Sequence, residues 1–210
     1  MTSARTSATA VRYALAIVAL AAVWLAMLLL GGGPVDRSIY EALYAGNHPA
    51  LVAVARGFTL LGEPTVLIAA SVIAAIGLWL AGHRRLPVVV IAVTMLGRGL
   101  SEAQKYWIAR ARPDFESHLV VVKTQSFPSG HANSSMIFYL MLALVLTEGG
   151  KCRRPAVAGA IMLSLCIGLS RVMLGVHWPS DVVGGWAFGM LWVLLTLRMA
   201  QRFVERDIRR

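Results

Sequence analysis

Three short stretches combine cations, histidines and a carboxylate within an otherwise apolar sequence. Residues 105–113 hold two cations in a helical spacing, residues 128–131 hold a serine, a glycine and a histidine, and residues 170–181 hold an arginine, a histidine and an aspartate. Cations bind phosphoryl oxygens, and histidines can transfer protons or attack phosphorus when a carboxylate orients them. These residue types therefore predict a site that binds a phosphate group and breaks its ester bond.

The stretch 170–181 supplies a nucleophile in the form of a histidine–aspartate pair. Asp181 follows His177 by four residues, which is one helical turn or a compact turn. Asp181 can therefore hold one nitrogen of the imidazole and leave the other free to attack. Arg171 comes earlier in the same stretch and suits a bidentate contact with phosphate.

The stretch 128–131, Pro-Ser-Gly-His, has the pattern of a helix start. Proline suits the first turn, where the backbone N–H groups of Ser129, Gly130 and His131 would be free to bind an anion. The Ser129 hydroxyl adds a donor, and His131 would stand beside the anion, able to give a proton to a leaving oxygen. The tetrapeptide alone is equally compatible with a helix start that carries an interfacial histidine.

The first stretch continues a series of charges with helical spacing. Arg98, Lys105 and Arg112 follow each other at intervals of seven residues, so we expect them on one face of a helix that ends at Pro113. Glu102 can pair with either neighbouring cation. A structural Arg98–Glu102 bridge is favoured because unpaired charge inside a membrane is costly, and the alternative is that the pair orients Lys105.

The composition indicates an all-α, multi-pass membrane protein. Hydrophobic residues make up 58% of the 210 residues and charged residues only 14%, which is less charge than a soluble domain carries. The net charge of +10 falls in short segments between apolar ones, as in cytoplasmic loops, so it indicates contact with anionic lipid and argues against nucleic-acid binding. Two isolated cysteines, Cys152 and Cys166, suit neither a disulfide nor a metal site.

Six apolar segments are predicted to span the membrane: residues 12–30, 64–81, 87–108, 128–147, 155–174 and 181–200. The first is expected to be a retained helix, because a cleaved signal peptide has a shorter apolar core. The protein is expected in the inner (cell) membrane. With six spans, both of its termini lie in the cytoplasm. All three chemistry-bearing stretches then lie on the opposite, non-cytoplasmic face.

The segments between the spans are less informative. We expect a short amphipathic helix within residues 35–50, capped by Asp36 and with its tyrosines at the membrane interface. Residues 50–61 are either a kinked extension of the second span or a helix near the surface. Residues 113–127 are expected to form a solvated outer loop in which His118 is an ordinary surface residue, and Gly185 with Gly189 is expected to allow close helix packing.

The three stretches together resemble the type 2 phosphatidic acid phosphatase family of lipid phosphatases and vanadium haloperoxidases. The family motifs are Lys, six residues and Arg-Pro; Pro-Ser-Gly-His; and Ser-Arg, five residues, His, three residues and Asp. The chain matches them with Lys105, Arg112 and Pro113, then 128–131, then Ser170, Arg171, His177 and Asp181. The resemblance covers the second to the sixth span, within a single domain of residues 1–210 whose core is about 62–200 and whose basic cytoplasmic tail is 201–210.

The resemblance implies a six-helix fold and a phosphatase that uses neither a metal ion nor a cofactor. By resemblance, His177 would form a phosphohistidine, Asp181 would orient it and His131 would protonate the leaving group. The phosphoryl oxygens would be bound by Lys105, Arg112, Ser129, Gly130, Ser170 and Arg171; the role of Ser170 rests on resemblance alone. Arg98 and Glu102 would support Lys105.

The preferred substrate is a lipid phosphate at the outer face, with undecaprenyl diphosphate favoured over phosphatidic acid, phosphatidylglycerol phosphate and lipid A phosphates. Phosphotransfer from a lipid diphosphate to another lipid is an alternative on the same scaffold. A vanadate-dependent oxidase is disfavoured because those relatives are soluble. A non-catalytic lipid transporter is least favoured, because His131, His177 and Asp181 are all present. The sequence leaves the oligomeric state open.

Overall fold

The computed structural model describes residues 2–148 and 150–208, and these residues form eight helices and no strand. Proline or glycine stands at the start of most of them, where a missing or free N–H group costs least. The helices are α1 (Thr2–Leu30), α2 (Pro34–Leu43), α3 (Pro49–Leu61), α4 (Pro64–Leu80), α5 (Leu86–Ile108), α6 (Gly130–Leu146), α7 (Arg153–Met173) and α8 (Pro179–Ile208). The side chains of the predicted tail, 201–210, lie outside the described part of the chain.

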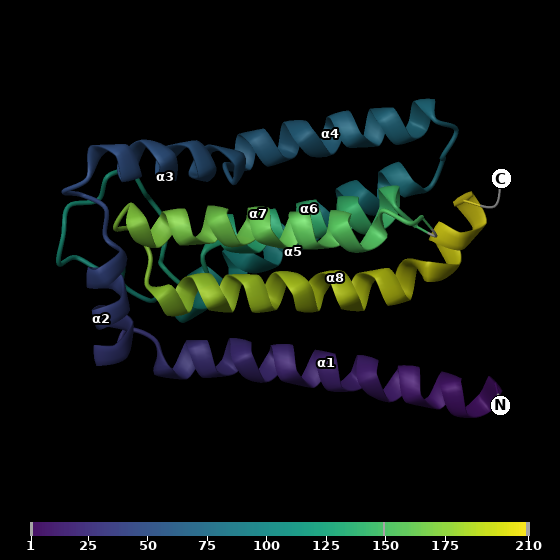
Figure 1. The fold of residues 1–210 in the computed structure, drawn as a ribbon, viewed down its shortest axis with the longest axis horizontal. Coiled ribbons are helices and arrows are strands. Elements are labelled where there is room, and N and C mark those ends of the chain that lie inside the picture. The colour runs from purple at the N-terminus through teal and green to yellow at the C-terminus, as the bar shows by residue number, and fades with distance from the viewer. Residues whose placement is uncertain (1, 149, 209–210) are drawn as a thin grey trace.

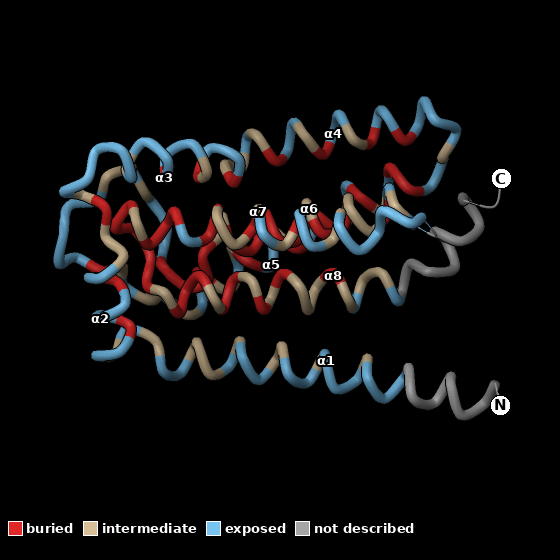
Figure 2. Tube along the Cα trace, in the orientation of Figure 1, coloured by how far each residue is buried: buried red, intermediate tan, exposed pale blue. Residues whose placement is uncertain are grey.

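The helices run roughly side by side, and the short α2 crosses one end of the bundle (Figure 1). Both termini and the α4–α5 turn lie at the other end. Helix α6 packs against α5, α7 and α8, and α1 packs against α8. Figure 2 shows buried residues gathered in α6, α7 and α8, towards the end where α2 lies. The centre of the bundle at that end is therefore the part best shielded from solvent and lipid.

The prediction of an all-α membrane bundle is confirmed, while the count of six spans stays a prediction. The apolar part of α1 (Ala10–Leu30), α5, α7 and the first part of α8 (Pro179–Arg198) are each long and apolar enough to cross a membrane. Helices α3 and α4 pass together as one span bent by 45°. Helix α6 has 17 residues, or about 26 Å at 1.5 Å per residue, slightly less than the ~30 Å of a typical hydrocarbon core.

The bend between α3 and α4 answers the question that the sequence left open for residues 50–61. These residues are helical and continue towards the second predicted span, with the break at Gly62 and Glu63. Pro64 lacks an N–H group and starts the new helix. The kinked extension is therefore the arrangement that the structure adopts, and the break carries a carboxylate into the bundle.

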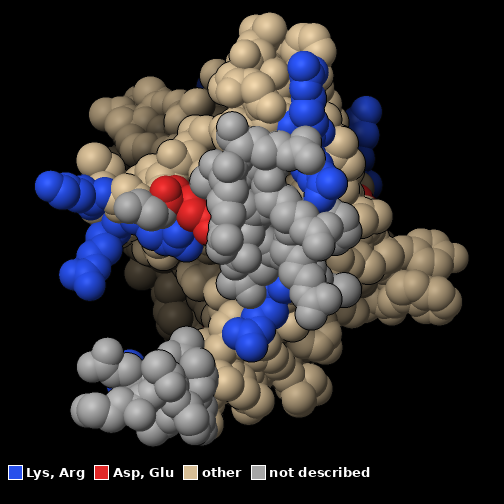
Figure 3. Space-filling view, turned by 90° about the vertical axis from the view of Figure 1, so that its right-hand side faces the viewer, with Lys and Arg blue, Asp and Glu red and all other residues tan. Residues whose placement is uncertain are grey.

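The end of the bundle that holds the termini is basic. Figure 3 looks onto this end and shows Lys and Arg side chains around it with little acidic surface between them. The turns at this end contain Arg84, Arg85 and Lys151, and the first turn of α7 adds Arg153 and Arg154. This distribution is the one the positive-inside rule associates with the cytoplasmic side.

Helix α2 differs from expectation in how its polar groups are used. Asp36 does not cap α2, whose N-cap position is Gly33. Its carboxylate accepts hydrogen bonds from the backbone N–H of Gly32 at 2.8 Å and of Ser180 at 2.8 Å, so it caps the start of α8. Tyr40 is fully buried instead of interfacial. Helix α2 thus serves as a brace across the end of α8.

The small residues of α8 pack as predicted. A Cβ atom on Gly189 would lie 2.9 Å from the Cβ of Met136, and one on Gly185 would lie 2.8 Å from the carbonyl oxygen of Ser129. Both distances are too short for carbon in van der Waals contact, so glycine is what lets α8 approach α6. This contact sets the start of α6 against the start of α8.

Candidate active site

The three predicted stretches meet at the end of the bundle where α2 lies, around a cavity of about 220 Å³. The cavity lies at the end of α5, the start of α6 and the α7–α8 turn. The predicted site residues that line it are Arg98, Lys105, Glu102, Arg112, Gly130, His131, Arg171 and His177. Four of these residues are Lys or Arg, and Lys123 is a fifth cation that lines the cavity, against the two carboxylates of Glu63 and Glu102. The cavity is therefore strongly suited to an anion.

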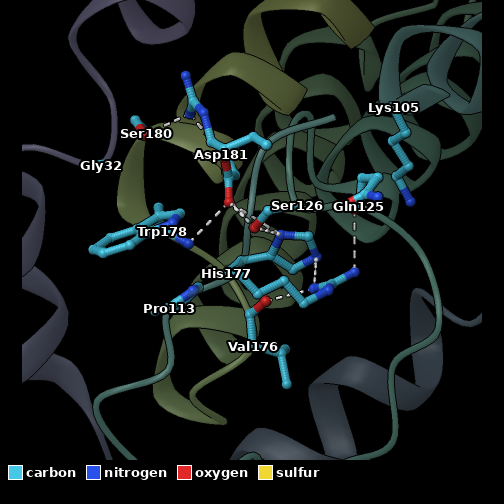
Figure 4. Close-up of polar contacts among 12 residues, drawn as sticks. Gly32, Lys105, Pro113, Gln125, Ser126, Val176, His177, Trp178, Ser180 and Asp181 are labelled. Carbon is cyan, nitrogen blue, oxygen red and sulfur yellow. Dashed lines mark hydrogen bonds and ion pairs between the residues drawn. The ribbon is translucent and has the colours of Figure 1, made fainter. Parts of the chain in front are cut away.

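His177 and Asp181 are brought together by the tight turn between α7 and α8. Gly175 has a φ of +77°, which favours glycine, and Pro179 then starts α8 so that Asp181 falls in its first turn. Nδ1 of His177 lies 3.4 Å from Oδ2 of Asp181. The same oxygen accepts hydrogen bonds from the backbone N–H of Trp178 at 3.0 Å and from the hydroxyl of Ser126. Figure 4 shows these groups gathered on the carboxylate.

The second nitrogen of His177 is directed at the cavity. Nε2 lies 3.1 Å from Nη1 of Arg112, and a guanidinium group can only donate, so Nε2 accepts and carries no proton. The proton of the neutral ring is then on Nδ1, facing Asp181. Burial, and after it the positive charge of Arg112, lowers the pKa of His177 well below its usual value of 6.5. This arrangement presents an unprotonated nitrogen to an anion in the cavity.

Arg112 reaches the site from a loop, which corrects the predicted helix. Helix α5 ends at Ile108, followed by Ala109 in the left-handed region with a φ of +50°, so Arg112 does not share a helix face with Lys105. Its guanidinium donates to the carbonyl oxygens of Thr124 at 2.9 Å and Gln125 at 3.3 Å, and also to that of Val176. Backbone acceptors hold this cation beside His177.

Lys105 is buried at the same cavity and pairs with Glu102. Its Nζ lies 3.4 Å from Oε1 of Glu102 and 3.1 Å from the hydroxyl of Thr124. The predicted Arg98–Glu102 bridge is wrong: within the described residues the ion pair of Glu102 is with Lys105, and Arg98 lines the cavity. The buried ammonium has the greater need of the carboxylate, since burial penalises its charge.

The start of α6 is placed as predicted, with one exception. The backbone N–H of Ser129 donates to the carbonyl oxygen of Asp181 at 2.9 Å, so it is not free to bind an anion. The N–H groups of Gly130 and His131 lie in the first turn of α6, where backbone N–H groups have no acceptor within the helix. A Cβ atom on Gly130 would lie 3.1 Å from Nζ of Lys105, so glycine leaves room for the ammonium there.

Two of the predicted phosphate ligands lie off the cavity. The hydroxyl of Ser170 donates to the carbonyl oxygen of Ile167 at 2.6 Å, within its own helix. The hydroxyl of Ser129 is buried and has no hydrogen-bond partner among the described residues. Arg171 does line the cavity: its Nη1 donates to Thr59 at 2.6 Å, while its buried Nε has no partner in the described part of the chain. Arg171 therefore reaches the cavity with its donors only partly used by the described residues.

The structure adds residues that the sequence reasoning missed. Glu63, at the break between α3 and α4, lies 3.3 Å from Nε2 of His131 and lines the cavity. Ser126 donates to Asp181, and Nη1 of Arg110 lies 2.9 Å from the other oxygen of that carboxylate. The sequence could have indicated Glu63 as a site residue, because it is a carboxylate between two apolar segments. Nothing in the sequence distinguishes Ser126 from other loop serines.

Most of the loop 113–127 is exposed, as predicted, and part of it also reaches the cavity. His118 is exposed, with its Nε2 2.8 Å from the carbonyl oxygen of Pro113, while Lys123 and Thr124 line the cavity. The loop is thus one wall of the site. The described residues contain no group of three or more His, Cys, Asp or Glu side chains placed to hold a metal ion.

Comparison with known proteins gives a consistent assignment. Residues 85–205 match the PAP2 superfamily. Phosphatidylglycerophosphatase B of Bacillus subtilis is 32% identical over 160 residues, which cover 74% of this chain and 78% of that protein. Decaprenylphosphoryl-5-phosphoribose phosphatase of Mycobacterium tuberculosis is 32% identical over 147 residues, covering 68% and 77%.

The fold agrees with a solved relative. The crystal structure of a transmembrane PAP2 type phosphatidylglycerolphosphate phosphatase from Bacillus subtilis superposes with a TM-score of 0.82 at 29% identity, covering 89% of this chain and 96% of that one. The family match includes all three stretches that form the cavity. The chain therefore belongs to the PAP2 superfamily and is a multi-pass membrane lipid phosphatase, a hydrolase.

Proposed function

We propose that this protein hydrolyses a lipid phosphomonoester or diphosphate through a phosphohistidine formed on His177, without a metal ion. The observation that carries the proposal is the direction of His177. Its Nδ1 is held by Asp181, and its unprotonated Nε2 faces a cavity lined by Lys105, Arg112 and Arg171. A nucleophile beside several fixed cations is the arrangement that phosphoryl transfer requires.

In the first step Nε2 of His177 attacks phosphorus, and the bond from phosphorus to the leaving oxygen breaks. His131 gives its proton to that oxygen, and Asp181 stabilises the positive charge that forms on the His177 ring. In the second step water attacks the phosphohistidine, its proton passes to His131, and the P–N bond breaks to release phosphate. His131 is then protonated for the next cycle.

The cations and the start of α6 are proposed to bind the phosphoryl oxygens. Lys105, Arg112 and Arg171 supply charged donors, and the backbone N–H groups of Gly130 and His131 add neutral ones. Ser129 was expected as a ligand from the helix-start pattern and Ser170 by resemblance, but their positions support at most an indirect role. Glu63 is proposed to orient His131 through the contact at 3.3 Å.

The substrate is proposed to bind by its headgroup alone. A cavity of about 220 Å³ is below the roughly 300–1,000 Å³ of pockets that enclose a drug-sized ligand, so the lipid chains must remain outside it, along the apolar helices. Undecaprenyl diphosphate is the favoured substrate. Phosphatidic acid, lipid A phosphates and phosphatidylglycerol phosphate are further candidates, the last supported by the name of the Bacillus subtilis relative.

The reaction is proposed to take place at the non-cytoplasmic face of the cell membrane. Two features support this side: the basic loops lie at the opposite end of the bundle, and both termini lie there too (Figures 1 and 3). By the positive-inside rule the basic end is cytoplasmic. Oligomeric state does not enter the proposal, because the cavity is formed within one chain.

The test is phosphate release by the purified protein in detergent with excess EDTA. The substrates would be undecaprenyl diphosphate, phosphatidic acid and phosphatidylglycerol phosphate, with the His177→Ala variant beside the wild type. Release that survives EDTA and disappears in the variant is expected. Loss of activity with EDTA that Mg²⁺ restores would contradict the metal-independent step.

A second use of the phosphohistidine, transfer to another lipid, is distinguished in the same assay. It has the same support, because an acceptor hydroxyl would occupy the place of water. Substrate with a labelled terminal phosphate would give label in solution for hydrolysis and label on a lipid for transfer. We expect the label in solution.

A further inference from the structure

Arg110 contacts the carboxylate of the His177–Asp181 pair without lining the cavity. Its Nη1 lies 2.9 Å from Oδ1 of Asp181 and 3.1 Å from the hydroxyl of Ser180. The Arg110 side chain is only 13% exposed and that of Asp181 is 0% exposed. Arg110 is absent from the described residues that line the cavity, so it contacts Asp181 outside the substrate space.

The two oxygens of Asp181 therefore have different hydrogen-bond partners. Oδ1 is occupied by Arg110, and Oδ2 accepts from Trp178 and Ser126 and faces Nδ1 of His177. A carboxylate that is wholly buried needs a compensating charge to remain ionised. Without the ionised form, Asp181 would stabilise the developing positive charge on His177 much less.

Arg110 is itself held by the first helix. Its Nη2 donates to the carbonyl oxygens of Met27 at 3.0 Å and Leu28 at 2.5 Å, in the last turn of α1. Carbonyls in that turn lack intrahelical donors, and a cation suits the end of a helix. The guanidinium carbon also lies 4.4 Å from the centroid of the Phe127 ring, within the range of a cation–π contact.

The contact extends to the brace formed by α2. The hydroxyl of Ser180 accepts from Arg110 and donates to Asp36, which also accepts from the Ser180 backbone. A Cβ atom on Gly31 would lie 2.4 Å from Nη1 of Arg110, so glycine at this position leaves room for the guanidinium. The end of α1, the start of α8 and α2 thus converge on one side chain.

We infer that Arg110 is a positioning residue for the reaction: it keeps Asp181 ionised and turned towards His177, and it makes α1 part of the catalytic assembly. This inference rests on the proposed phosphohistidine mechanism. The family match begins at residue 85 and so leaves out α1, yet α1 supplies the carbonyl oxygens that fix Arg110. The first helix therefore does more than anchor the protein in the membrane.

The test is the kinetics of Arg110→Gln with phosphatidylglycerol phosphate in detergent, beside the wild type and His177→Ala. We expect kcat to fall about 10- to 100-fold, a size typical of losing an outer hydrogen-bond partner in a site. We expect KM to change less than about threefold, because Arg110 lies outside the cavity. Activity of the wild type that His177→Ala abolishes establishes the proposed function in the same experiment.

A double-mutant cycle shows whether Arg110 acts through Asp181. In an Asp181→Asn background the Arg110→Gln change should reduce kcat by less than about threefold further, because the carboxylate it serves is gone. An equal loss in both backgrounds, or a rise in KM with kcat unchanged, would overturn the inference. Single-turnover measurements give the rates where steady-state turnover is too slow.

Two more variants separate positioning from general loss of structure. Gly31→Ala leaves all charges in place, but its Cβ would lie 2.3 Å from Oγ of Ser180 and 2.4 Å from Nη1 of Arg110, so it displaces the contact between these two groups. It should lower kcat in the same direction and also lose its effect in the Asp181→Asn background. Trp24→Phe removes the hydrogen bond from α1 to Gln104 at 3.0 Å and leaves Asp181 untouched, so it should keep kcat within about twofold. A loss in Trp24→Phe equal to that in Arg110→Gln would assign the effect to α1 packing alone.

Discussion

At the scale of single residues, the two histidines of the cavity differ in what surrounds them. His177 is fully enclosed and contacts Arg112 and Asp181, whereas His131 contacts the half-exposed Glu63. An environment of cations favours the neutral ring that a nucleophile needs. The contact of His131 with the Glu63 carboxylate suits a general acid, which must donate a proton and then recover it. The same residue type can therefore take two roles in one cavity.

The pH dependence of activity follows from the lowered pKa of His177. A group with a lowered pKa stays unprotonated as the pH falls through 6.5, so the acid limb of kcat/KM that it sets must lie below pH 6.5. The need for a protonated His131 gives the alkaline limb, and the profile is bell-shaped. Measuring kcat/KM from pH 4 to pH 9 checks this, with buffers of constant ionic strength. A rate that changes in one direction only across this range would contradict the paired roles.

The same shift affects stability. Below pH 6.5 the unfolded chain binds a proton at His177 that the folded chain does not, so this residue lowers the free energy of unfolding as the pH falls. The apparent melting temperature in detergent should therefore fall between pH 7 and pH 5 in the wild type, and less in His177→Gln. An equal fall in both proteins would assign the acid sensitivity to other groups.

The role of His131 is tested by varying the leaving group. His131→Ala should lower kcat for an alkyl phosphate such as phosphatidic acid by about 10²- to 10⁴-fold, the usual contribution of a general acid. An aryl phosphate such as p-nitrophenyl phosphate departs without a proton, so its turnover should fall far less. Glu63→Gln should show a weaker loss with the same preference. Equal losses with both substrates would mean that His131 binds phosphate without donating a proton.

At the scale of the helices, the sequence identified the contacts that are local and missed those that are distant. His177 and Asp181 are four residues apart, and their pairing follows from that spacing. The contacts of Asp181 with Arg110 and Ser126 span 71 and 55 residues, so only the folded bundle reveals them. The predicted span ended at residue 108, as α5 does, but the helix was expected to continue to Arg112 because no glycine or proline follows until Pro113.

Packing of α8 against α6 gives a prediction about stability. Gly189→Ala puts a methyl group 2.9 Å from the Cβ of Met136, so we expect a loss of about 1–3 kcal/mol in the free energy of unfolding. The control is Gly159→Ala on α7, where an added Cβ meets nothing within 4 Å and no loss is expected. Thermal unfolding in detergent compares the two. Equal melting temperatures for both variants would contradict the close approach of the helices.

At the scale of the whole molecule, the charge distribution and the position of the site specify an orientation in the membrane. The basic turns lie at the end that holds both termini, and the cavity lies at the other (Figures 1 and 3). Cys152 is exposed in the α6–α7 turn at the basic end, and Val121 is 87% exposed in the loop beside the cavity. These two positions give a direct readout of which end faces outwards.

A membrane-impermeant maleimide applied to intact cells should label Val121→Cys in a background with Cys152→Ser and Cys166→Ala. It should leave Cys152 of the Cys166→Ala protein unlabelled until the cells are opened, because the basic end faces the cytoplasm. Total accessible thiol, measured after permeabilisation, controls for expression and reactivity at each position. The reverse pattern would place the cavity in the cytoplasm. Labelling of both positions from outside would show that α6, the one helix between them, does not cross the membrane, which would contradict the proposed orientation.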